Sequence, residues 1–265
     1  MLKNSILSLL KKLTGLALIN PENWRVKHEF ERLNLPPKLL QVIRKNTMVN
    51  ESRLVNLQEV IRYVASANLP GAYVECGVWK GGSVAFAAHQ FLSNKHQAPL
   101  HLFDAFDDIC QPDAAVDGQR AVHDVGGNTN AAGQLTPVKG VYDKLGGPGE
   151  EQKVVELIAT QVGYPKEKIH IHKGWFQDTL PVDSAQVGEI AVLRLDGDWY
   201  SSTKVCLDYL FNQVVSGGVI IVDDYGCYEG CKKAVDEFLQ AQNLTPFLIK
   251  VDDECVYWIK QGRNV

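Results

Sequence analysis

The stretch AYVECGVWKGGSVAFAAHQFLSNKHQAPLHLFDAF, residues 72–106, decides the fold. Residues 72–77 and 99–106 are short apolar runs of strand length, and residues 83–92 have the pattern of a helix. A glycine-rich turn joins the first run to the helix. This order of strand, turn, helix and strand predicts a unit of two parallel strands with a helix crossing between them.

The same alternation continues along the chain. Further strands are predicted at 168–174, 189–198 and 217–225, and helices at 150–162, 201–213 and 229–240. The final segment, TPFLIKVDDECVYWIKQ, residues 245–261, has the pattern of two antiparallel strands. We therefore predict an α/β fold: a mostly parallel seven-stranded sheet with helices on both faces. Ligands of such sheets bind at the carboxyl ends of the strands.

The N-terminal part of the chain differs from this alternation. Residues 1–68 have helical patterns with short breaks, so we predict an N-terminal helical extension followed by the α/β domain at 69–265. The first twenty residues are amphipathic, but none of their apolar runs approaches the roughly 18 residues of a membrane span. We expect this helix to pack on the body or on a second subunit, with binding to a membrane surface as the alternative.

A long insertion follows the second strand. Residues 105–149, called the lid below, contain eight glycines and no regular period. Loops of this length inside a compact domain are usually functional or disordered. Because the lid begins at the carboxyl end of a strand, we expect it to fold over the ligand site, with a disordered insertion as the alternative.

Composition narrows the classes of partner. The chain has 265 residues, a formal net charge of −4 and a pI near 6.0, which argues against a nucleic-acid-binding surface. Its six cysteines are irregularly spaced and no secretory leader is evident, which indicates reduced thiols and a cytoplasmic protein. A charged small molecule remains a suitable ligand.

Carboxylates end two neighbouring strands of the predicted sheet. Asp196 and Asp198 follow one apolar run, and Asp223 and Asp224 follow the next. Four like charges at one edge repel each other, so a cation is expected among them. Hard oxygen ligands suit Mg²⁺, Mn²⁺ or Ca²⁺ rather than zinc. The alternative is a set of surface acids that cap helices.

Two further acids follow the earlier strands. Glu75 lies in the glycine-rich turn beside Gly77, where it would repel a phosphate and suits the amino group of a ligand. Asp104 ends the second strand, the place where an acid commonly binds a ribose diol. Together they indicate an adenosine linked to an amino acid. Trp175 and Phe176, after the third strand, either flank an adenine ring or belong to the core.

Six motifs in this order are similar to one family. They are YVECGVWKGGS (73–83), LFDAF (102–106), HKGWFQDTLP (172–181), LRLDGDWYSST (193–203), GGVIIVDDYG (217–226) and GCKKAVDEF (230–238). Over about residues 47–262 the chain resembles the macrocin O-methyltransferase family. The resemblance implies a Rossmann-like class I methyltransferase that depends on S-adenosylmethionine and on Mg²⁺ or Mn²⁺. The implied acceptor is a hydroxyl of a sugar or of a glycosylated natural product.

The resemblance also implies roles for individual residues. The implied cofactor-binding residues are Glu75, Gly77 and Ser83 along the methionine part, Asp104 at the ribose, Trp175 near the adenine, and Asp196. The implied metal ligands are Asp196, Asp223 and Asp224.

Two residues are candidates for the base that takes the acceptor's proton. His123, in the lid, is favoured by the pKa of about 6.5 of an ordinary histidine. Asp198 is favoured by its position two residues from an expected metal ligand. A nearby dication would lower the pKa of Asp198 and make it a poor base, so His123 is the favoured candidate and Asp198 the alternative.

Three other functions are compatible with parts of this sequence pattern. A catechol-type acceptor also chelates Mg²⁺, a metal-dependent hydrolase would use the acids without an adenosine site, and a non-catalytic binder would keep only the fold. We expect a small-molecule acceptor, no nucleic acid, no stable membrane span, and assembly as a homo-oligomer.

Overall fold

The computed structural model describes residues 33, 35–129 and 135–262. The chain divides into two compact units, Met1–Leu35 and Pro36–Val265, and the fold described here is that of the second. The amphipathic segment predicted for the first twenty residues lies outside the described residues. Among the residues that are described, no helix is long and apolar enough to cross a membrane.

A seven-stranded sheet forms the centre of this unit, with strand order β3-β2-β1-β4-β5-β7-β6. Strands β1 to β5 run parallel, and β7 pairs antiparallel with both β5 and β6. The strands are β1 (Ala72–Cys76), β2 (Leu100–Asp104), β3 (Ile169–Lys173), β4 (Ile190–Leu195), β5 (Val214–Val222), β6 (Ile249–Lys250) and β7 (Val256–Ile259). The predicted sheet, including its antiparallel end, is confirmed.

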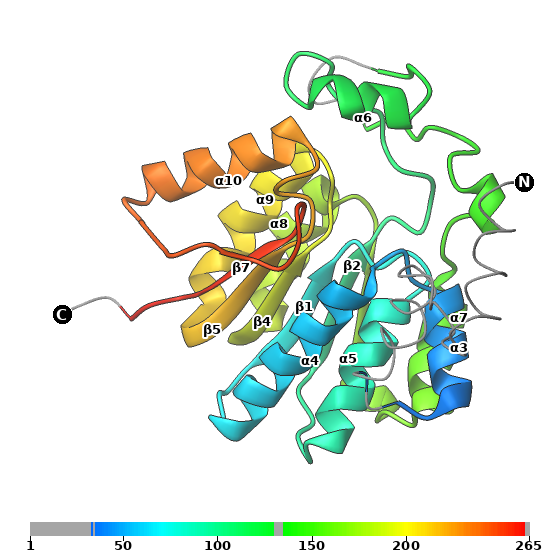
Figure 1. Ribbon diagram of the computed structural model, residues 1–265, viewed down its shortest axis with the longest axis vertical. Coiled ribbons are helices and arrows are strands. Elements are labelled where there is room, and N and C mark those ends of the chain that lie inside the picture. The colour runs from blue at the N-terminus through cyan, green and yellow to red at the C-terminus, as the bar shows by residue number, and fades with distance from the viewer. Residues whose placement is uncertain (1–32, 34, 130–134, 263–265) are drawn as a thin grey trace, which may run out of the picture. The chain divides into compact units, whose positions relative to one another are not determined.

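Helices cover both faces of the sheet (Figure 1). The α-helices are α3 (Pro37–Lys45), α4 (Glu51–Ser66), α5 (Gly82–Ser93), α6 (Gly118–Asp124), α7 (Glu151–Glu156), α8 (Phe176–Val187), α9 (Tyr200–Leu210) and α10 (Glu229–Ala241). Shorter helical turns are η2 (Asp143–Leu145), η3 (Leu157–Val162), η4 (Lys166–Lys168) and η5 (Phe211–Gln213). Helix α7 continues into η3, and α9 into η5, as the predicted helical patterns require.

The core on one face lies between the sheet and helices α8, α9 and α10. Alternate residues of β1, such as Val74, point to this side and pack with Leu180, Leu207 and Val235 of the three helices. The opposite face carries α4 and α5, where Tyr73 meets Phe91 edge-to-face at 6.1 Å between ring centroids. Burial of both faces explains why the strands are continuous apolar runs rather than alternating ones.

Helices α3 and α4 belong to the segment predicted as an N-terminal extension. Both pack against α5, and the backbone N–H of Gly82 donates to the carbonyl of Asn46 at 2.8 Å. Asn50 caps α4 by accepting a hydrogen bond from the backbone N–H of Arg53. The division of the chain at residue 68 stays a prediction.

The lid contains more regular structure than its composition indicates. Helix α6 lies within it, beyond the carboxyl ends of the strands (Figure 1), and Cys110 forms a β-bridge with Pro137. A small apolar cluster joins the lid to the body: it includes Ala121, Val125 and Trp199. The indole N–H of Trp199 donates to the carbonyl of Cys110 at 2.8 Å. These contacts hold the described part of the lid beside the strand ends.

Candidate active site

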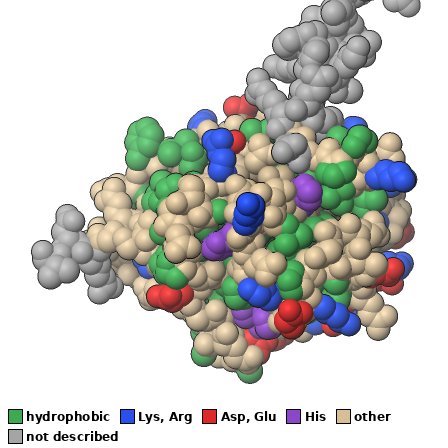
Figure 2. Space-filling model, turned by 90° about the horizontal axis from the view of Figure 1, so that it is seen from below, with side chains coloured by type: hydrophobic (Ala, Val, Ile, Leu, Met, Phe, Trp, Pro, Cys, Tyr) green, Lys and Arg blue, Asp and Glu red, His purple; other side chains and the backbone are tan. Residues whose placement is uncertain are grey.

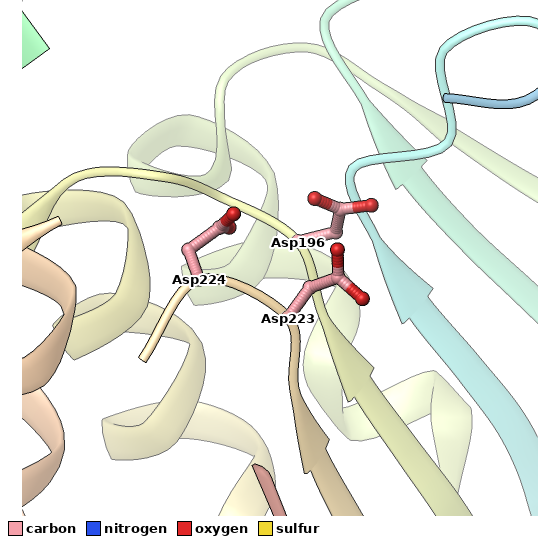
Figure 3. Close-up of side chains that lie close together, drawn as sticks. All are labelled: Asp196, Asp223 and Asp224. Atoms are coloured by element: carbon pink, nitrogen blue, oxygen red, sulfur yellow. The ribbon is translucent and has the colours of Figure 1, made fainter. Parts of the chain in front are cut away.

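The acids at the ends of β4 and β5 lie together. Leu195 pairs with Val222 in the sheet, so the residues that follow, Asp196 and Asp223, emerge side by side. One carboxylate oxygen from each of Asp196, Asp223 and Asp224 lies within 4.8 Å of the other two, and Figure 3 shows the three side chains grouped at the strand ends. We call these three residues the acid cluster.

An arginine inside the sheet supports this cluster. Arg194, with a side chain 3% exposed, donates from Nη1 to Asp196 Oδ2 at 2.8 Å and to Glu75 Oε1 at 2.9 Å. Its Nη2 donates to Asp223 Oδ1 at 2.7 Å. A second arginine, Arg53 of α4, donates from Nη1 to Asp223 Oδ2 at 2.5 Å. The protein therefore supplies part of the positive charge that the acids require.

The remaining negative charge is still unfavourable. The pKa of Asp196 is raised to about 7, and burial is the largest cause. Repulsion from Asp223 and Glu75 also raises this pKa, and the attraction of Arg194 opposes these effects without cancelling them. Burial, followed by repulsion from Asp198, also raises the pKa of Asp224. Three carboxylate oxygens at this spacing fit a hard divalent cation, which would relieve this repulsion.

Asp198 completes the acidic edge. Its backbone adopts φ 59°, a left-handed conformation that aspartate tolerates better than most residues. In this conformation its N–H donates to Asp224 Oδ2 at 3.1 Å. Burial and the nearby charge of Asp196 raise the pKa of Asp198. The loop from 196 to 199 thus contributes Asp196 to the cluster and places a further acid, Asp198, directly beside it.

Two adjoining cavities open at the strand ends, with volumes of ≈ 80 Å³ and ≈ 210 Å³. Residues that line both are Gly77, Asp104, Asp107, Ile109, Tyr142, Asp196, Asp198 and Trp199. The smaller cavity is also lined by Trp175 and Phe176, and the larger by Asp124 and Tyr228. Four acids, Asp104, Asp107, Asp196 and Asp198, therefore lie where the two cavities meet, whereas Asp223 and Asp224 line neither cavity.

The turn after β1 and the end of β2 form one wall. Asp104 accepts hydrogen bonds from the backbone N–H groups of Val78 at 2.6 Å, Trp79 at 2.8 Å and Phe106 at 2.6 Å. Glycine is needed at Gly77, because its φ is 92° and a Cβ there would collide with the carbonyl oxygen of Asp196. Backbone from β1 and β4 can thus approach closely at the base of the cavities.

One buried acceptor in this wall has no partner among the described residues. Asp108 is 6% exposed, and its Oδ1 makes no hydrogen bond there, while its Oδ2 accepts from the N–H of Gly140 at 3.1 Å. Asp108 lines the smaller cavity. An unpaired buried oxygen is unfavourable. This oxygen has almost no accessible surface, so it does not face the space of the cavity.

A cavity of ≈ 590 Å³, larger than either of these two, lies at the opposite end of the sheet, where β5 begins and β7 ends. Val214, Ile259 and Lys260 are among the residues that line it, and no aspartate or glutamate does. Figure 2 views the molecule from that side, and acidic side chains are few and scattered there. The acidic side chains that line the cavities, rather than the volume of a cavity, therefore identify the site at the carboxyl ends of the strands.

Comparisons with known proteins identify the family. A sequence profile described as macrocin-O-methyltransferase (TylF) matches residues 43–260, more than three quarters of the chain. The chain belongs to the macrocin O-methyltransferase family. Demethyldecarbamoylnovobiocin O-methyltransferase of Streptomyces niveus is 33% identical over 214 residues, which cover 80% of this chain and 75% of the relative.

Further relatives agree with this assignment. The 8-demethyl-8-(2,3-dimethoxy-alpha-L-rhamnosyl)-tetracenomycin-C 4′-O-methyltransferase of Streptomyces olivaceus is 32% identical over 217 residues, covering 80% of this chain and 75% of that one. The solved structure of the O-methyltransferase NovP has a TM-score of 0.64 at 31% identity, over 82% of this chain and 83% of NovP. This chain is accordingly an S-adenosylmethionine-dependent O-methyltransferase with the predicted Rossmann-like class I fold.

The structure places five of the ten predicted site residues at the cavities. Gly77, Asp104, Trp175, Asp196 and Asp198 line one or both of them. Asp223 and Asp224 lie buried beside Asp196. Five of these seven residues therefore line the cavities, and the other two are reached only through Asp196.

Glu75 and Ser83 lie behind the O-methyltransferase site rather than on its surface. Glu75 has no exposed surface, and its oxygens accept hydrogen bonds from Tyr73, from Ser83 Oγ and from Arg194. Neither residue lines the two cavities. In this structure Glu75 therefore orients Arg194, because a buried carboxylate is stable only when it is paired with an opposite charge.

His123 is separate from the cavities. It lies on α6 with its side chain 88% exposed, and its Nδ1 lies 3.1 Å from Asp124 Oδ1. The structure brings Asp198, but not His123, to the acid cluster. His123 lies in the glycine-rich lid, which has no regular period, so the sequence could not indicate which way its ring points.

Residues of the candidate site that the sequence did not indicate include Arg53, Tyr142, Arg194 and Trp199. Arg194 carried a usable signal, because a lone charge inside the apolar run IAVLRL needs a buried partner. Arg53 and Tyr142 lie in helical and lid segments whose local patterns do not indicate a site.

Proposed function

We propose that this enzyme transfers a methyl group from S-adenosylmethionine to a hydroxyl of a sugar carried by a glycosylated natural product, with a divalent cation held by the acid cluster. The convergence of Asp196, Asp223 and Asp224 carries the proposal, because Asp196 lines both cavities and the other two acids lie buried beside it. The name of one relative contains a rhamnosyl group, which supports a sugar as acceptor.

The smaller cavity suits the nucleoside of the cofactor. The carboxylate of Asp104 offers an acceptor for hydroxyl or amine donors, and Trp175 and Phe176 offer aromatic faces. The methyl donor supplies an activated methyl group on a positively charged sulfur. Acids around the cavities would favour binding of that positive charge.

The acid cluster suits Mg²⁺ or Mn²⁺, and the larger cavity suits the acceptor. A cation held there would act as a Lewis acid and would lower the pKa of an acceptor hydroxyl. Asp198 is the proposed base, because it lines both cavities while His123 lines neither. Arg194 keeps two of the acids in fixed positions, so that the hydroxyl meets a preorganised site.

The proposal is tested by incubating the full chain with S-adenosylmethionine bearing a labelled methyl group and a panel of acceptors. The panel contains rhamnosides and other glycosides with vicinal hydroxyls, their aglycones, and simple catechols. We expect label in a glycoside, loss of transfer with a chelator, and recovery with added Mg²⁺. Transfer to catechols alone would overturn the sugar acceptor, and chelator-resistant transfer would overturn the metal.

A further inference from the structure

Arg53 of α4 links three separate parts of the chain. Besides its bond to Asp223, its Nε donates to Asp252 Oδ2 at 2.7 Å and its Nη2 to Glu254 Oε2 at 2.6 Å. All three guanidinium nitrogens are thus used, and the side chain is only 10% exposed. Burial opposes the charge of Arg53, but Asp223, Asp252 and Glu254 together raise its pKa.

The connection between β6 and β7 holds the guanidinium in place. Asp252 Oδ1 accepts hydrogen bonds from the backbone N–H groups of Glu254 at 2.9 Å and Cys255 at 2.8 Å. Asn50, the cap of α4, donates to Asp252 Oδ2 at 2.7 Å. Asp252, which accepts from Arg53, is thus itself fixed both by its own loop and by Asn50 of α4. These bonds hold the guanidinium of Arg53 where it contacts Asp223.

The same set of contacts continues to α6. Glu254 offers its other oxygen, Oε1, to Nη2 of Arg120 at 2.8 Å. Arg120 lies over the ring of Tyr228 at 5.6 Å, and the hydroxyl of Tyr228 donates to Asp124 Oδ2 at 3.1 Å. Asp124 and Tyr228 line the larger cavity. One chain of charged contacts therefore runs from an acid-cluster residue to the helix beside the proposed acceptor cavity.

We propose that Arg53 is a positioning residue that fixes the orientation of Asp223 and, through Glu254 and Arg120, holds α6 beside the larger cavity. The part of this inference that concerns cation binding rests on the proposed function. The part that concerns α6 rests on the contacts of the protein alone.

The geometry requires arginine rather than lysine. A guanidinium presents its donors in a flat fork, and here the fork serves carboxylates on three sides. A lysine at the same place keeps the charge but offers one compact ammonium on a flexible stem. Arg53→Lys therefore removes the orientation of Asp223 and Glu254 while leaving the charge of the site unchanged.

Three variants of the full chain separate this role from a merely structural one. Arg53→Lys removes the fork, and Arg120→Gln breaks only the contact to α6. Arg62→Lys is the matched control, because Arg62 lies on the same helix in an exposed pair with Glu59. The readouts are Mg²⁺ affinity by calorimetry and amide hydrogen exchange over residues 118–124 without added ligands.

We expect Arg53→Lys to bind Mg²⁺ about tenfold or more weakly, as is usual when a partner of a metal ligand is lost. We expect it also to speed exchange in α6. Arg120→Gln should speed exchange in α6 and leave Mg²⁺ affinity unchanged, and Arg62→Lys should change neither quantity.

Wild-type affinity together with wild-type exchange in Arg53→Lys would overturn the proposal. Faster exchange throughout the chain, rather than at α6, would show a structural role and would also overturn it. Failure of the wild-type protein to bind Mg²⁺ would instead contradict the proposed metal, and the α6 exchange of the same variants would still decide the role of Arg53.

Discussion

Arg194 donates a hydrogen bond from Nη2 to Oδ1 of Asp223 at 2.7 Å, so a buried cation lies directly against the acid cluster. The same guanidinium contacts Glu75, which has no exposed surface. Burial raises the pKa of Glu75, and Arg194 opposes this effect. The site is therefore built on an ion network inside the sheet, whose members depend on one another.

Removing Arg194 should destabilise the protein strongly. Arg194→Met leaves Glu75 and Asp223 without their buried partner, and breaking such a pair typically costs about 3–5 kcal/mol in the free energy of unfolding. Urea denaturation measures this loss, with Lys204→Met, from an exposed pair with Asp208, as the control. Adding Glu75→Gln should recover part of the loss. An unchanged urea midpoint in Arg194→Met would contradict the account of this network.

Much of the site could be predicted because apolar strands end abruptly. Asp104, Asp196 and Asp223 each stand at or just after the last residue of a strand, and the parallel order brings the strand ends together. The partners of these acids could not be predicted in the same way. Arg53 lies 170 residues from Asp223 in the chain, and no local pattern joins them.

Two other features were hidden from local patterns. Helix α8 was not predicted, because Pro181 interrupts its hydrogen bonding and its apolar positions are sparse. The packing of the lid was not predicted either, because its small cluster is completed by Trp199 from the loop after β4. Tertiary contacts, rather than period or propensity, stabilise both segments.

Asp104→Asn should weaken binding of S-adenosylmethionine far more than binding of Mg²⁺. The substitution removes a charged acceptor at the wall of both cavities, and such a hydrogen bond contributes roughly 1.5–3 kcal/mol. Calorimetry with each ligand measures the two affinities. Asp208→Asn is the control, since Asp208 is an exposed acid on α9 that is paired with Lys204 and lines neither cavity. Equal cofactor affinity in wild type and Asp104→Asn would remove Asp104 from the cofactor site.

The two candidate bases should differ in their effect on turnover. Asp198→Asn should lower kcat about 10²–10⁴-fold at saturating cofactor and metal, which is the usual loss for a general base. His123→Ala should keep near-wild-type turnover, because its side chain is exposed and lies outside both cavities. The measurement is kcat for both variants from pH 6 to 9. A large loss in His123→Ala with little loss in Asp198→Asn would reverse the assignment.

Cation affinity should rise with pH up to about 7. The pKa of Asp196 is raised from 3.8 to about 7, chiefly by burial, so below pH 7 this carboxylate holds a proton that a cation must displace. Affinity should fall by up to about tenfold per pH unit below that value and level off above it. The raised pKa also means that the metal-free protein loses stability as pH rises from about 4 through 7. Mg²⁺ affinity that is constant from pH 5.5 to 8 would contradict this pKa.

Equilibrium binding of Mn²⁺, followed through the electron spin resonance signal of the free ion, tests the central claim most directly. The comparison uses wild type, Asp224→Asn in the acid cluster, and Asp208→Asn at an exposed position on α9. We predict that wild type and Asp208→Asn remove one equivalent of Mn²⁺ from solution, that Mg²⁺ displaces it, and that Asp224→Asn binds at least about tenfold more weakly. Equal binding by all three proteins, or none by wild type, would contradict a divalent cation at the acid cluster.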